Sequence, residues 1–177
     1  TGQLHTVKLQ DVPFGKFRDK GVPIDNISNY DSQKEYAITV ESQTSLNLYR
    51  ILFVTAQAMM KIVDGGEFDV AKRTVAATKL QDNDEVISVE IIREQKQVIL
   101  QSAEGYFLRF GLEEVPEKKK SAVGVRGMKL SDKDHVEAVY YTLAAMPDPD
   151  IVYKDKHVEL QRIKPQHRDS KGTKLRL

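Results

Sequence analysis

The stretch Thr74-Val75-Ala76-Ala77-Thr78-Lys79-Leu80 returns fifty residues later as Gly124-Val125-Arg126-Gly127-Met128-Lys129-Leu130. The shared template is a small residue, a valine and an aliphatic residue six positions on. It occurs earlier at Gly21-Val22 with Ile27, and a truncated copy begins at Gly172-Thr173. A fixed period of this size is typical of propellers, solenoids and arrays. The period therefore predicts the fold better than any single motif does.

Short apolar or alternating runs lie around these copies, and no helical period is sustained over a dozen residues. Glu104-Gly105 separates two of the runs and predicts a hairpin turn, because glycine accepts the positive φ that tight hairpins need. This pattern favours an all-β barrel or propeller. Residues rich in β-branched and aromatic side chains predict strands at 4–9, 36–40, 51–55, 59–63, 86–91, 98–101, 106–110 and 136–140.

Each repeat contains about four strands, which is the size of one propeller blade. We expect a single partial domain with a partial blade at 1–47, blades at 48–96 and 97–146, and a partial blade at 147–177. The first copy starts at the turn before its second strand and the last stops inside its third, so the chain reads as a fragment. Two prolines between Tyr141 and Asp150 predict a connection between blades there.

Composition excludes several classes of protein. Without cysteine there is neither a disulfide framework nor a thiolate metal site, which fits a reducing cytosolic compartment. No apolar run approaches the roughly 18 residues that a membrane span needs, and the N-terminus lacks a secretory apolar region. We therefore expect a soluble, cytoplasmic protein with no membrane partner.

The net charge of +1 conceals a segregation of charge along the chain. Four short segments, within residues 16–20, 72–79, 118–126 and 162–177, carry +2, +3, +4 and +5. They total +14, so the rest of the chain carries −13 beside the net +1. The distribution of charge is more informative here than its sum.

The basic segments fall at equivalent points of the repeat, since Lys20, Arg73, Lys120 and Lys171 are separated by 53, 47 and 51 residues. In an array the equivalent loops lie along one rim, so the clusters form one long positive track that suits the phosphates of a DNA duplex. Ordinary solvated loops would explain one such cluster more easily than four in phase. Lysines without a groove-reading helix predict sequence-tolerant binding. The expected DNA-binding residues are Lys16, Arg18, Lys20, Lys72, Arg73, Lys79, Lys118, Lys119, Lys120, Arg126, Arg168, Lys171, Lys174 and Arg176.

Other candidate sites are weaker. The Asp82-x-Asp84 and Asp132-x-Asp134 turns could bind a divalent cation, but aspartates that cap their own backbone are commoner. The four histidines show no metal-ligand spacing, and residues 106–110 fit core packing better than RNA stacking. We predict no catalytic residue, no metal site and no cofactor in this chain.

The repeats from Ile51 to Thr142 resemble the blades in the C-terminal domain of the A subunit of DNA gyrase and of its topoisomerase IV paralogue. The resemblance rests on the order and period of residues 71–80, 105–110 and 124–131. The partial copies at 2–40 and 151–177 resemble the same repeat less closely. Thr74 and Ala58 stand where the family repeat has glycine. The chain also lacks the Gln-Arg-Arg-Gly-Gly-x-Gly box that marks gyrase, which favours topoisomerase IV and leaves gyrase open.

The resemblance implies a β-pinwheel, a propeller-like array of four-stranded antiparallel blades, here about three to four of them. Its basic outer rim would bend DNA and present a segment for ATP-dependent strand passage, in supercoiling or decatenation. The catalytic tyrosine would lie in another part of the A subunit, and a B subunit would hydrolyse ATP with Mg. These partners, the duplex and a place near the nucleoid are expectations from the family.

Two further classes of function stay open from the sequence. A propeller used as a protein-interaction platform would expose apolar patches between its blades, would not wrap DNA and would show no DNA affinity that depends steeply on salt. An enzyme with its site in a propeller channel would need polar groups converging from several blades, and none recur in the repeats.

Overall fold

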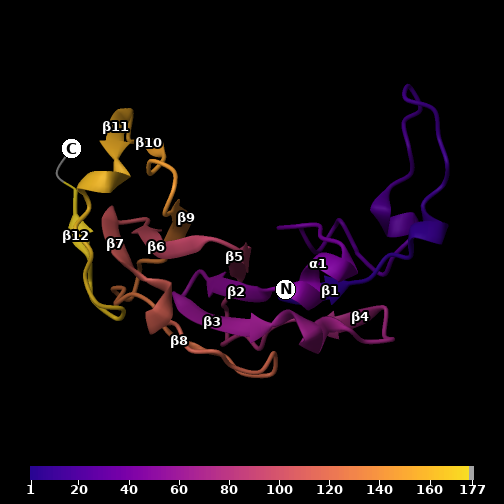
Figure 1. Cartoon of the computed structure of the whole chain (residues 1–177), viewed down its shortest axis with the longest axis horizontal. Coiled ribbons are helices and arrows are strands. Elements are labelled where there is room, and N and C mark those ends of the chain that lie inside the picture. The colour runs from indigo at the N-terminus through magenta and orange to yellow at the C-terminus, as the bar shows by residue number, and fades with distance from the viewer. Residues whose placement is uncertain (176–177) are drawn as a thin grey trace.

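The structure is a computed structural model that describes residues 1–175. The chain forms an open arc of small antiparallel sheets (Figure 1). The strands are β1 (Gln3–His5), β2 (Arg50–Thr55), β3 (Met59–Asp64), β4 (Thr74–Ala76), β5 (Val86–Ile92), β6 (Gln95–Ser102), β7 (Tyr106–Gly111), β8 (Val125–Arg126), β9 (Val136–Leu143), β10 (Asp150–Tyr153), β11 (Lys156–Glu159) and β12 (Thr173–Lys174). In this described part, one short helix, α1 (Gln43–Leu48), and five 3-10 turns lie between them: η1 (Leu9–Asp11), η2 (Ile24–Asn26), η3 (Gly65–Phe68), η4 (Leu112–Glu114) and η5 (Leu160–Arg162).

Within residues 1–175, three of the sheets take one edge strand from the following repeat. The two four-stranded sheets have the orders β5-β2-β3-β8 and β12-β7-β6-β9. In the same way β4 pairs with β1, while β10 and β11 form a two-stranded hairpin. The third strand of a repeat therefore joins the sheet before it and ties neighbouring blades together. This topology confirms the expected all-β pinwheel. The sheets cross the expected blade limits at 48–96 and 97–146, so those limits remain a proposed division of the sequence.

The tight turns of the two complete blades have the same backbone geometry. Gly105 precedes β7 with a φ of 84°, and Ala58 precedes β3 with a φ of 60°. Alanine thus adopts the left-handed conformation that glycine takes in the next repeat. Ala58 is fully buried in the core, which holds this less favourable geometry in place.

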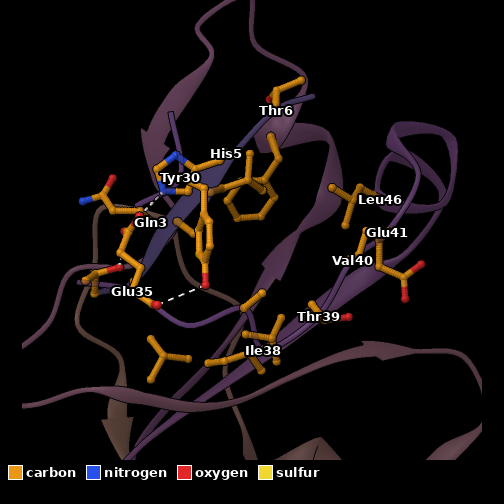
Figure 2. Close-up of a pocket in the computed structure, with 18 of the residues that line it drawn as sticks. Gln3, His5, Thr6, Tyr30, Glu35, Ile38, Thr39, Val40, Glu41 and Leu46 are labelled. Atoms are coloured by element: carbon orange, nitrogen blue, oxygen red, sulfur yellow. Dashed lines mark hydrogen bonds and ion pairs between the residues drawn. The ribbon is translucent and has the colours of Figure 1, made fainter. Parts of the chain in front are cut away.

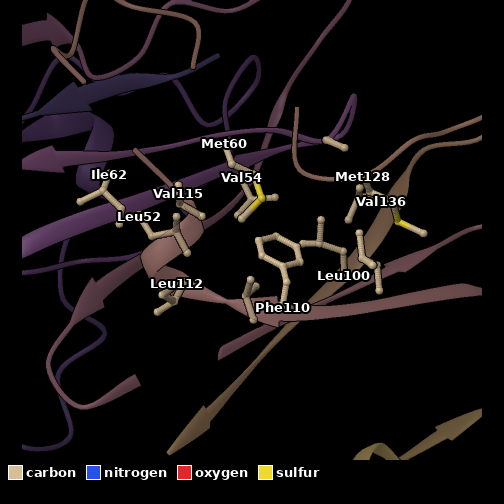
Figure 3. Close-up of a cluster of buried hydrophobic side chains, with 13 residues drawn as sticks. Leu52, Val54, Met60, Ile62, Leu100, Phe110, Leu112, Val115, Met128 and Val136 are labelled. Carbon is tan, nitrogen blue, oxygen red and sulfur yellow. The ribbon is translucent and has the colours of Figure 1, made fainter. Parts of the chain in front are cut away.

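Apolar side chains fill the space between successive blades. In β2, Leu52 and Val54 face the third repeat, whereas Ile51 and Phe53 face the first. Figure 3 shows the cluster between the second and third repeats, where Leu52, Val54 and Met60 meet Leu100 and Phe110. A similar cluster joins the third repeat to the fourth around Ile99, Phe107 and Leu160. Because strand side chains alternate between faces, each central strand contributes to two of these cores.

The first repeat departs most from the expected strands. Residues 36–40 form no strand, and β1 (Gln3–His5) covers only Leu4 and His5 of the expected strand at 4–9. In the complete blades β2 and β6 pair with a strand on each side, but residues 1–175 hold no such central strand for the first repeat. The copy Gly21-Val22 likewise forms no strand.

Two smaller differences concern connections. Helix α1 is not expected from the sequence pattern; Ser42 caps it by accepting a hydrogen bond from the backbone N–H of Ser45 at 3.1 Å. The connection expected at Tyr141–Asp150 is shorter, because β9 continues to Leu143 and β10 begins at Asp150. It still leads from one sheet to the next hairpin.

Candidate nucleic-acid interface

The basic loops flank the exchanged outer strands. Lys72 and Arg73 precede β4, Lys118 to Lys120 precede β8, and Lys171 precedes β12. Figure 1 shows the loops before β8 and β12 along the convex side of the arc, with β5 and β9 on its inner side. Strand exchange therefore brings basic segments from successive repeats onto one outer rim.

Several predicted side chains on this rim are exposed and carry their charge into solvent. Within residues 1–175 no ion pair or side-chain hydrogen bond involves the ammonium groups of Lys72, Lys79 and Lys118. Lys16, Arg18 and Lys20 are also exposed, on a long loop that extends from the arc (Figure 1). These six cations are exposed and therefore accessible to a polyanion.

The loop before β8, residues 118–124, is anchored by Glu67 of η3. The Glu67 carboxylate accepts the backbone N–H of Lys120 at 3.0 Å and pairs with the Lys119 ammonium at 3.3 Å. The hydrogen bond from Lys120, with help from Lys119, holds the pKa of Glu67 below its usual range. Lys120 is half-buried, and its ammonium donates to the Glu67 carbonyl oxygen at 2.6 Å. Of the three adjacent lysines, Lys118 and Lys119 thus face solvent, whereas the ammonium of Lys120 donates a hydrogen bond within the protein.

Lys61, which nothing in the sequence pattern singles out, lies beneath the same loop. It is fully buried in β3, and its ammonium donates to the carbonyl oxygens of Lys119, Lys120 and Ala122 at 3.0, 2.7 and 2.6 Å. Burial lowers the pKa of Lys61 to about 8, and the Glu67 carboxylate opposes that change. Lys61 therefore remains mostly protonated at neutral pH.

Two predicted arginines contact other parts of the chain. Arg126 makes two hydrogen bonds to Asp169, which raise the pKa of Arg126 and lower the pKa of Asp169. Arg168 donates to the backbone carbonyls of Glu114 at 3.0 Å and Arg126 at 2.6 Å. Both arginines join the third repeat to the fourth.

We expect Arg168→Ala to act through folding. It removes donors from two backbone carbonyls, so the free energy of unfolding should fall by about 1–3 kcal/mol. Chemical denaturation at pH 7 measures this, with Lys164→Ala, an exposed change in the same segment, as the control. Equal stability of the two variants would contradict the role of Arg168 in joining the repeats.

The remaining predicted cations have weaker contacts. Arg73 pairs with Asp11 at 3.5 Å, and the ammonium groups of Lys171 and Lys174 lie 4.6 and 5.1 Å from the centre of the Tyr106 ring. Arg176 lies outside the described residues. The prediction from sequence omits Lys129, which is exposed and lies fifty residues after Lys79. The two lysines occupy the same point of the repeat, so the spacing of the repeat is the signal that identifies Lys129.

The Asp-rich turns have a structural role. One carboxylate oxygen of Asp84 accepts the backbone N–H groups of Gln57 and Glu85, and Asp134 does the same for Glu104 and His135. Within residues 1–175 no cluster of three or more potential metal ligands is found. The aspartates therefore fix the hairpin turns, as the capping interpretation predicts.

A cavity of about 340 Å³ lies between the first and second repeats (Figure 2). Its walls are mostly apolar, and one edge carries a contact of His5 with Glu35 at 2.9 Å and a hydrogen bond from Tyr30 to the Glu35 carbonyl at 3.0 Å. Residues 3–7 and 36–41 line it, which are the segments that a central strand separates in the other repeats. The cavity thus lies beside a blade that has no central strand within residues 1–175, and no lysine or arginine lines it.

No helix in the described part of the chain is long and apolar enough to cross a membrane.

The exchanged strands, the interblade cores and the basic rim define a β-pinwheel domain. The model of the family described as DNA gyrase C-terminal domain, beta-propeller, matches residues 49–93 and 96–142, and the chain belongs to this family. The DNA gyrase A subunit of Lawsonia intracellularis is 30% identical over 139 residues, which cover 77% of this chain and 17% of that protein. The same subunit of Klebsiella oxytoca is 29% identical over 136 residues, 76% of this chain and 16% of that protein.

Solved structures agree on the fold. The C-terminal domain of DNA topoisomerase IV superposes with a TM-score of 0.80 at 23% identity, over 97% of this chain and 55% of that one. The DNA gyrase A C-terminal domain gives 0.69, also at 23% identity, over 97% and 56%. This chain thus spans about a sixth of the length of the gyrase subunits and about half of each domain structure.

Proposed function

We propose that this chain binds duplex DNA along its outer rim and bends it, as a non-catalytic part of the A subunit of a type IIA topoisomerase. The observation that carries the proposal is the recurrence of exposed basic side chains beside β4, β8 and β12. The rest of the chain, outside the four basic segments, carries a net charge of −13. Phosphate contacts of this kind gain affinity by releasing counterions and carry little base information.

The convex shape of the rim supports bending. A duplex that follows successive basic loops around an arc must curve, and its deformation is offset by the contacts that the curve permits. The family and the named relatives support a place beside the remainder of the A subunit, together with an ATPase B subunit, in the bacterial cytoplasm. ATP, Mg and the catalytic tyrosine would act elsewhere in that complex, in gyrase or in topoisomerase IV.

A protein-interaction platform is the second candidate. Leu9, Phe14 and Phe17 are 87%, 102% and 104% exposed in the first repeat, and such exposure favours apolar contacts at that end of the arc. These side chains lie on the same segment as Lys16, Arg18 and Lys20.

Two measurements test the proposal. Affinity for a duplex of about 40 base pairs, well below the roughly 150-base-pair persistence length, should fall steeply and log-linearly with salt. A nicked plasmid ligated with the protein present should change its linking number, because wrapped DNA stores writhe. Binding without a linking-number change would reject wrapping, and affinity that ignores salt would favour the interaction platform.

A further inference from the structure

The lysine loop, residues 118–124, is folded around a buried cation. All three N–H donors of the Lys61 ammonium are used by carbonyl oxygens of this loop, at 2.6 to 3.0 Å. Further along β3, Ile62 accepts the backbone N–H of Lys118 at 2.8 Å and donates to the Pro116 carbonyl at 3.1 Å. The loop thus turns its carbonyls inward.

This arrangement sets the direction of the charged side chains. With the carbonyls held inside, the Lys119 side chain is 82% exposed and Lys118 is exposed beside it. An unsatisfied buried carbonyl costs free energy, so without the ammonium the loop would have to open toward water. Lys61 itself is fully buried and has no access to a phosphate.

The second observation is that the next repeat has no cation at the equivalent position. Gly124 and Gly172 occupy the same place in successive repeats, and a Cβ on them would meet the side chains of Lys61 and Leu108, respectively. The buried position is thus leucine in the next blade. Leucine suffices where this position only packs in the core. The repeat that has the buried ammonium here is the one whose strand contacts the loop with three adjacent lysines.

We propose that Lys61 is a positioning residue for DNA binding, which holds residues 118–124 in the shape that presents Lys118 and Lys119 to the phosphates. The proposal rests on the DNA binding proposed above. It separates two kinds of lysine: Lys118 and Lys119 contact the ligand, and Lys61 orders them.

The test compares Lys61→Met with Lys118→Met in the 177-residue chain, since each removes one positive charge. Lys61→Met should weaken duplex binding about tenfold, the ordering cost of two flexible side chains, and leave the slope of log affinity against log salt unchanged. Lys118→Met should reduce the magnitude of that slope by about 0.9, because it removes a phosphate contact. Amide exchange at residues 119–122 should quicken only in Lys61→Met.

A second arm needs no substitution and so decides the matter even where Lys61→Met does not fold. The ammonium faces the loop carbonyls and the Phe53 ring, and the charged group that acts on it is Glu67. Burial lowers the pKa of Lys61 to about 8. Between about pH 7 and 9 the intact chain should lose a few-fold in affinity at constant ionic strength as Lys61 loses its charge and third donor. Stability should change the other way, rising with pH above about 8, because the unfolded chain then binds more protons than the folded one.

The outcomes separate this inference from the proposed function. If the intact chain shows no salt-dependent binding, the proposed function is rejected. If it binds, but Lys61→Met binds equally well or reduces the salt slope as Lys118→Met does, the positioning role is rejected. Unchanged affinity of the intact chain across the same pH range also rejects it.

Discussion

Replacement of Lys72, Lys79 and Lys118 by glutamate should weaken duplex binding by about 10²–10³-fold near 0.1 M salt, because each cation releases about one counterion. All three are exposed and belong to two successive repeats. Lys120 is left in place because its ammonium donates to the Glu67 carbonyl, so its removal would mix a change in folding with a change in binding. Fluorescence anisotropy across a salt series gives both affinity and slope.

The matched control is the triple change of Lys96, Lys133 and Lys156 to glutamate. These lysines are exposed and lie outside the basic segments, and their replacement alters the net charge by the same amount. If the track on the rim binds the duplex, the control should lose far less affinity and keep most of the slope. Equal losses in the two variants would mean that net charge alone governs binding.

The central part of the fold follows from local pattern. Runs such as 51–55 and 98–101 are apolar at nearly every position because both of their faces are buried between blades, and such runs are strongly predictive of strands. Residues 36–40 have a similar composition and yet form no strand, since a strand also needs a partner on its edge. The repeat pattern does not predict that β4, β8 and β12 pair with strands of the preceding repeat, because the sequence pattern of a strand does not specify its partner.

The repeat period predicts which residues of the candidate site occupy equivalent positions, but it does not predict what those residues contact. The period places Lys72 and Lys118 at equivalent points, and the structure brings both beside outer strands. What the sequence does not encode locally is which cations have internal partners: Arg168 contacts a residue 54 positions away, and Lys61 contacts carbonyls 58 to 61 positions away. Such partners are defined only once distant repeats pack together.

Gly124→Ala should remove most of the stability of the second blade. Gly124 has a φ of 107°, well beyond the left-handed well near roughly +57° that other residues occupy. A Cβ there would lie 2.3 Å from the Met60 carbonyl oxygen, a backbone atom of the strand with which β8 pairs. Strain and overpacking together should lower the free energy of unfolding by about 3–5 kcal/mol, a large part of the total for a small domain.

Gly21→Ala is the control, because Gly21 occupies the same position of the repeat as Gly124. The difference between the two variants isolates the effect of the close approach of Gly124 to β3. Gly21 also has a positive φ, 70°, but within the described part of the chain nothing lies within 4 Å of the position of its added Cβ. Its cost should therefore be limited to the conformational term of about 1–2 kcal/mol, and less where the exposed loop relaxes. Urea denaturation of both variants gives the difference. A loss for Gly124→Ala no greater than that for Gly21→Ala would mean that β8 can move away from β3, and that strand exchange contributes little to holding the lysine loop on the rim.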